Sequence, residues 1–223
     1  MTGITYRSAS EINSAMLGVY NNMFLAVANS MIVSLLVASS PALMQFLFTG
    51  AMKWIVIFAP LVAILALTFG MEKMTKGQAQ VALHGFAALM GMSFATIFVV
   101  FNIGSIVGAF MAAAVLFATM SMYGYFTKQS LDSLGKWMFV GLIAIIIASI
   151  INIFIGSSVA QMTISALAII IFLGLTAYDT QKIREMMSVD HNGNTEVIGA
   201  LTLYLDFINL FLNLLQLLGG RKE

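Results

Sequence analysis

The sequence predicts an all-α membrane protein with seven transmembrane helices, the last of which lies at the centre of the bundle. Of its 223 residues, 61% are hydrophobic and only 9% are charged, whereas an average soluble domain has roughly 25% charged residues. The apolar residues gather in seven runs that are long enough, or nearly long enough, to cross a bilayer. The seventh run carries a carboxylate near its middle, where lipid offers it no hydrogen-bond partner.

The runs follow one another without a Pro/Ser-rich linker or a shift in composition, which predicts one integral membrane domain over residues 1–223. A short polar segment, residues 1–17, precedes the first run. That run is longer than the apolar core of a secretory signal peptide, so we interpret it as a transmembrane helix. The predicted helices cover residues 18–39, 54–71, 85–103, 105–126, 137–155, 162–178 and 198–218.

The basic residues outside the runs predict the orientation of the chain, because cytoplasmic loops carry an excess of Lys and Arg. If the N-terminus is cytoplasmic and the C-terminus lies outside, the outer segments hold three basic residues, Lys53, Arg221 and Lys222, against seven in the cytoplasmic segments. The same orientation makes residues 1–17 a cytoplasmic segment and places most of the basic residues inside, namely Arg7, Lys73, Lys76, Lys128, Lys136, Lys182 and Arg184.

Composition excludes several classes of function. The chain has no cysteine and two histidines, which leaves no disulfide, no thiol nucleophile and no thiolate metal site. The net charge of +1 gives no basic excess that would favour binding to nucleic acid.

Several polar and small residues in or beside the runs are explained by helix packing. Asn21 and Asn22 in the first helix are interpreted as interhelical hydrogen-bonding residues, and His84 as an interfacial residue. Small residues would let the fourth helix pack closely on a neighbour: Gly108, Ala112, Ala113, Ala114 and Ala118.

The seventh run has a polar stripe along one side. At about 100° per residue, its polar side chains fall within roughly a quarter of the helix circumference. Hydrocarbon offers them no partners, so the stripe must face other helices or a water-filled path. We therefore expect this helix to be central and its stripe to line a pore, with Thr202, Asp206, Asn209, Asn213 and Gln216 on it.

A second carboxylate, Asp179, follows the sixth run at its cytoplasmic end. It is either an interfacial or capping acid or the partner of Asp206, which lies about 12 Å into the seventh helix. Asp179 reaches that depth if the sixth helix continues regularly beyond Tyr178. Two carboxylates in adjacent antiparallel helices would titrate as one unit that shares a proton. Such a pair can sense pH or bind calcium, which prefers carboxylate, amide and water oxygens.

The segments around both aspartates resemble the Bax-inhibitor-like family, also called the transmembrane Bax inhibitor motif family, in its bacterial branch. The resemblance rests on Gly174-Leu-Thr-Ala-Tyr-Asp-Thr-Gln-Lys-Ile183, Leu203-Tyr-Leu-Asp-Phe-Ile-Asn-Leu-Phe-Leu-Asn213 and Tyr123-Gly-Tyr-Phe-Thr-Lys128. It implies a seven-helix protein of the bacterial inner membrane, acting as a pH-sensitive calcium leak. The acidic pair that gates this leak maps onto Asp179 and Asp206. Family members studied as leaks engage the pair with a basic residue of the second helix, which here has none before Lys73.

Two other classes of function share some of these features. Presenilin-like proteases also use paired intramembrane aspartates, and Tyr178-Asp179 reproduces one of their half-motifs. The other half-motif, Gly-x-Gly-Asp, is absent around Asp206, so we expect no enzymatic activity and no cofactor. The remaining alternative is a membrane regulator that transports nothing and binds a membrane protease or another membrane protein.

Overall fold

The computed structural model describes residues 7–189, 193–220 and 222, and this part of the chain is helical without a β-strand. Seven of its helical segments are long and apolar enough to cross a membrane, as the sequence predicts. A short helix, α2 (Pro41–Phe48), lies in the connection between the first two spanning segments and was not predicted. The spanning segments are α1 (Ala9–Ala38), α3 (Met52–Gly70) with η1 (Met71–Lys73), α4 (Lys76–Phe94) with α5 (Ile97–Val100), α6 (Ile103–Phe126), α7 (Asp132–Ile155), α8 (Ser158–Val189) and α9 (Asn194–Leu218).

Two helices begin well before their hydrophobic runs because capping boxes start them. Ser8 and Glu11 cap α1 reciprocally, so residues 9–17 are helical and the predicted polar segment before the first helix is shorter than expected. Residues 1–6 of that segment lie outside the described residues. Thr75 and Gln78 form the same motif before α4, which therefore begins at Lys76 and not at residue 85. Hydropathy does not detect these starts, because the residues that form them are polar.

The contacts of the chain fall into two compact units, and two helices contribute to both of them. α8 and α9 each pass from one unit into the other. The interpretation of the chain as a single domain stays a prediction. The first unit comprises Met1–Phe101, Met186–Tyr204 and Lys222, and the second comprises Asn102–Glu185, Leu205–Arg221 and Glu223.

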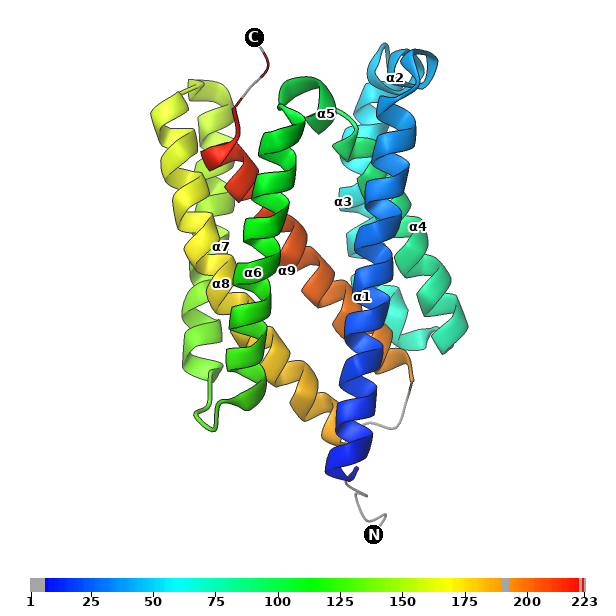
Figure 1. Cartoon of the computed structure of the whole chain (residues 1–223), viewed down its shortest axis with the longest axis vertical. Coiled ribbons are helices and arrows are strands. Elements are labelled where there is room, and N and C mark those ends of the chain that lie inside the picture. Colours follow the sequence, from blue (N-terminus) through cyan, green and yellow to red (C-terminus); the bar gives the residue numbers. More distant parts are fainter. Residues whose placement is uncertain (1–6, 190–192, 221, 223) are drawn as a thin grey trace. The chain divides into compact units, whose positions relative to one another are not determined.

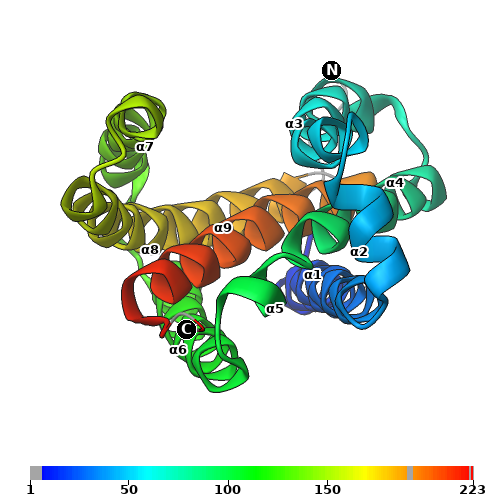
Figure 2. The same ribbon diagram turned by 90° about the horizontal axis from the view of Figure 1, so that it is seen from above.

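In the first unit, α1 lies beside α4, and the beginning of α9 packs against both (Figures 1 and 2). The Ser30 hydroxyl donates to the carbonyl oxygen of Ala87 at 2.8 Å and hydrogen-bonds with the Tyr204 hydroxyl at 2.7 Å. The Phe86 ring meets the Tyr204 ring edge-on at 5.9 Å. Glycine at position 91 permits this approach, since a Cβ at Gly91 would lie 2.6 Å from the carbonyl oxygen of Ser30.

In the second unit, α8 packs against α6, α7 and the C-terminal part of α9. The hydroxyls of Ser121 in α6 and Thr180 in α8 are 3.0 Å apart. Gly135 in α7 leaves room for the Tyr178 ring of α8, which a Cβ at that position would strike. The rings of Phe110 and Phe117 in α6 contact Phe207 of α9 edge-on, at 5.3 and 5.7 Å.

The last helix is the most enclosed of the seven. Of the most apolar window of α9, 67% is buried, against 11% to 39% in the other spanning segments. Leu203 and Tyr204 are fully buried in the first unit, and Leu210 and Leu215 are at most 1% exposed in the second. The sequence-based prediction of a central last helix is therefore confirmed.

Candidate functional site

The structure brings Asp179 of α8 and Asp206 of α9 together within the second unit. The predicted continuation of the sixth helix is confirmed, because α8 runs unbroken through Asp179 to Val189. The two carboxyl groups interact through a side-chain hydrogen bond. An ionised carboxylate can only accept hydrogen bonds, so a hydrogen bond between two carboxyl groups forms only when the pair holds a proton. Asp179 is therefore a partner of Asp206 and not an interfacial cap.

The aspartate pair lies in an environment that offers it few hydrogen-bond partners and no ion pair among the described residues. Asp206 is 4% exposed, and its Oδ2 atom is buried without a hydrogen-bond partner among the described residues. Ion pairs within the described residues join Lys76 to Glu196 and Lys182 to Glu185, and none of them includes either aspartate. Two buried carboxylates without a cation are costly when both are ionised. Two carboxyl groups in such an environment are therefore accommodated at lower cost when the pair carries at most one negative charge.

Three other side chains of the predicted stripe, those of Thr202, Asn209 and Asn213, bond to their own helix. The Thr202 hydroxyl donates to the carbonyl oxygen of Ile198 at 3.2 Å. The amide groups of Asn209 and Asn213 donate to the carbonyl oxygens of Leu205 and Asn209, both at 2.8 Å. All three side chains, together with Gln216, are half-buried.

Some oxygen atoms of this half-buried stripe are still available as hydrogen-bond acceptors. Thr202 belongs to the first unit, whereas Asn209, Asn213 and Gln216 belong to the second unit with the aspartates. The side-chain Oδ1 atoms of Asn209 and Asn213 accept no hydrogen bond from the described residues. An amide oxygen of this kind can accept from water or bind a hard cation. The pore-lining role of these residues stays a prediction.

The pair supplies only part of a calcium site. No cluster of three or more His, Cys, Asp or Glu side chains suited to a metal occurs in the described part of the chain. Calcium in proteins takes about six to eight oxygen ligands, so Asp179 and Asp206 would leave most positions to water and amide oxygens.

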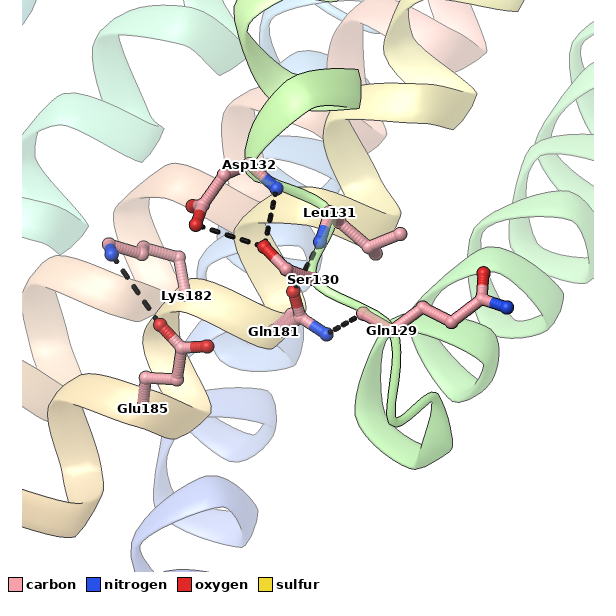
Figure 3. A network of polar contacts seen from close by, with 7 residues as sticks. All are labelled: Gln129, Ser130, Leu131, Asp132, Gln181, Lys182 and Glu185. Carbon is pink, nitrogen blue, oxygen red and sulfur yellow. Dashed lines mark hydrogen bonds and ion pairs between the residues drawn. The ribbon is translucent and has the colours of Figure 1, made fainter.

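A second polar network lies just beyond Asp179 and was missed from the sequence (Figure 3). Gln181 is 9% exposed and holds the connection between α6 and α7 by two hydrogen bonds. Its Oε1 accepts from the backbone N–H of Leu131 at 2.8 Å, and its Nε2 donates to the carbonyl oxygen of Gln129 at 2.9 Å. The apolar pattern gave no signal for this contact, although Gln181 lies within the Asp179 motif.

A basic residue further along α8 fastens the end of α6. Arg184 donates to the carbonyl oxygen of Tyr125 at 2.9 Å, and its guanidinium lies 4.9 Å from the centre of the Tyr125 ring. The sequence identified Arg184 and Lys182 only as topology determinants. Both ends of the α6–α7 connection are thus tied to α8 within two turns of Asp179, which couples the position of α8 to that of this connection.

Comparison with known proteins shows similarity to one family along nearly the whole chain. The family described as "Inhibitor of apoptosis-promoting Bax1" matches residues 12–223. The inner membrane protein YbhL of Escherichia coli K12 is 36% identical over 218 residues, which is 95% of this chain and 93% of that protein. Protein RP147 of Rickettsia prowazekii is 37% identical over 212 residues, covering 93% of this chain and 90% of its own length. A Borreliella burgdorferi protein is 33% identical over 217 residues, covering 95% and 94%.

Proposed function

This chain belongs to the Bax inhibitor family, and from that premise we propose that it is a pH-sensitive cation leak of a bacterial inner membrane, with calcium as the transported ion. The observation that carries the proposal is the buried contact between Asp179 and Asp206, which has no basic partner among the described residues. The membrane assignment rests on the E. coli relative, which is named an inner membrane protein, and on the seven apolar helices. Transport of this kind involves no catalytic step.

The pair acts as a proton-dependent latch between α8 and α9. With a proton present, the hydrogen bond between Asp179 and Asp206 holds the two helices together. When that proton is lost, two negative charges about 4 Å apart repel each other by about 4 kcal/mol at an effective dielectric constant of about 20. Separation of the helices, binding of a cation or return of the proton relieves this repulsion. Acid therefore favours the closed state, and flux rises with pH.

The half-buried stripe of α9 provides oxygen atoms for a partly hydrated ion. Asn209 and Asn213 direct their N–H groups to their own helix, so their Oδ1 atoms remain as acceptors. A hydrated divalent cation exchanges water for such oxygens at modest cost, because calcium accepts irregular coordination. The orientation that accompanies this proposal has the N-terminus in the cytoplasm and the C-terminus outside.

The test is calcium release from liposomes that contain the purified full-length protein, measured between about pH 5 and pH 8. Wild-type flux should fall as the pH is lowered. Asp206→Asn and Asp179→Asn each remove the shared negative charge and should flatten this pH dependence. Asp132→Asn is the matched control, because Asp132 is an exposed carboxylate in the same unit and should leave the profile unchanged.

The opposite outcome would favour the alternative function. If both pair variants keep the wild-type flux and its full pH response, the pair is structural. The protein would then be better described as a membrane regulator that binds a membrane protease or another membrane protein. Asp206→Ala separates the two roles of the carboxyl group, because asparagine can imitate the protonated partner in a hydrogen bond and alanine cannot.

A further inference from the structure

A polar cleft opens in the first unit between the first halves of α1 and α4. Its volume is about 730 Å³, which lies within the usual range of roughly 300–1,000 Å³ for small-molecule sites. Glu196, in the first turn of α9, also lines it. The polar side chains that line the cleft are Asn21, Asn22, Lys76, Gln80, His84 and Glu196.

The cleft contains a charged pair that is neutral overall. The Lys76 ammonium contacts the Glu196 carboxylate at 2.6 Å, with side-chain exposures of 47% and 16%. Glycine at position 18 leaves space for that carboxylate, since a Cβ at Gly18 would lie 2.7 Å from its Oε2 atom. The exposed ammonium can bind an anion while the carboxylate binds a cation, so the pair suits a ligand with both charges.

Two polar side chains in the cleft have no partner. Asn22 is satisfied, because its Nδ2 donates to the carbonyl oxygen of Gly18 at 2.8 Å and its Oδ1 accepts from Gln80 at 3.1 Å. In contrast, the side chains of Asn21 and His84 make no hydrogen bond with any described residue, which corrects the interpretation of Asn21 as an interhelical contact. Asn21 is exposed and His84 is half-buried, so both side chains can bond to a molecule in the cleft. The cleft therefore favours a polar occupant.

The ion pair and two aliphatic side chains of the cleft lie at different heights along the helices. Lys76 is the first residue of α4, and the exposed side chain of Val81 follows about 7.5 Å further along the axis. Leu25 of α1, 44% exposed, lines the same cleft. The headgroup layer of a bilayer is about 5–8 Å thick on each side. This spacing places the ion pair among headgroups and the two aliphatic side chains at the start of the acyl chains.

We propose that this cleft binds a zwitterionic aminophospholipid of the phosphatidylethanolamine type, in the leaflet on the N-terminal side of the protein. The phosphate accepts a hydrogen bond from Lys76, while the ammonium group donates to Glu196 and to the amide oxygen of Asn21. The acyl chains continue along Leu25. A headgroup without an ammonium group would add a second negative charge beside Glu196, with Lys76 as the one cation shared between them, which disfavours anionic lipids.

The test is native mass spectrometry of the delipidated full-length protein titrated with phosphatidylethanolamine or phosphatidylglycerol. Wild type should retain phosphatidylethanolamine preferentially. Glu196→Gln should weaken its binding about tenfold, the effect of losing one charge-assisted hydrogen bond. The same variant should turn the preference toward phosphatidylglycerol, because Lys76 is then uncompensated. Lys76→Gln should weaken retention of both lipids.

The controls change the same charges outside the cleft. Glu72→Gln and Lys73→Gln affect exposed neighbours of the cleft-lining segment and should preserve the wild-type preference. Asn21→Leu leaves the ion pair intact and should also reduce retention of phosphatidylethanolamine. Because Asn21 lies on α1, this variant tests the cleft without a substitution in α4. Equal retention of both lipids by wild type, or an unchanged preference in Glu196→Gln, would overturn the proposal. Displacement by an equal concentration of soluble glycerophosphoethanolamine would refute the membrane source of the ligand.

Discussion

Replacement of Gly124 by alanine should separate α6 from α8 close to the aspartate pair. A Cβ at Gly124 would lie 2.8 Å from the carbonyl carbon and 2.9 Å from the Cα of Ala177, and a backbone cannot turn aside as a side chain can. The separation would also weaken the hydrogen bond between Ser121 and Thr180. Alanine gains up to about 1 kcal/mol in helix propensity. Overpacking costs about 1–3 kcal/mol, and an interhelical hydrogen bond in a membrane contributes about 0.6 kcal/mol, so we expect a net destabilisation of about 1–2 kcal/mol.

Reversible unfolding in mixed micelles measures this difference, and the same helix offers a control. Gly108 is exposed, and a Cβ there would meet nothing within 4 Å, so Gly108→Ala should be at least as stable as wild type. Because both substitutions add one methyl group to α6, the comparison removes the contribution of helix propensity. If Gly124→Ala proves as stable as Gly108→Ala, α6 and α8 do not approach as closely as the structure indicates, and the reasoning fails.

Three further predictions test the α6–α7 connection, the polar stripe and the topology. Gln181→Leu removes both hydrogen bonds to the α6–α7 connection and should speed proteolysis after Lys128 several-fold. If the variant is cleaved at the wild-type rate, these hydrogen bonds do not restrain the connection. Asn209→Cys should react with water-soluble thiol reagents and Ile153→Cys, whose native side chain is 77% exposed, with lipid-soluble ones. The reverse pattern would place the stripe against lipid. A C-terminal alkaline phosphatase fusion should be active and a fluorescent protein fusion dark, and the converse would invert the topology.

The sequence alone determined the spanning character of the chain and the polarity of its last helix. Both properties are local: a run of about 20 apolar residues crosses a bilayer whatever its neighbours are, and the angular position of a side chain follows from the helix repeat. The importance of Asp206 could therefore be predicted. Its contact with Asp179 was inferred only conditionally, because α8 continues through a polar segment that hydropathy assigns to the membrane surface.

The tertiary structure decided which faces of the helices meet. Of the small residues that the sequence indicated as packing residues of α6, Ala113 is fully buried, whereas Gly108 and Ala118 are exposed. The close approach to α8 is made instead at Gly124. Lipid is as apolar as a leucine side chain, so the composition of a helix face does not reveal whether it contacts lipid or protein. Lys76 and Glu196, separated by 120 positions, likewise meet only because α1, α4 and α9 pack together. Contacts of this kind arise from the shapes of several helices at once, which no local pattern in the chain records.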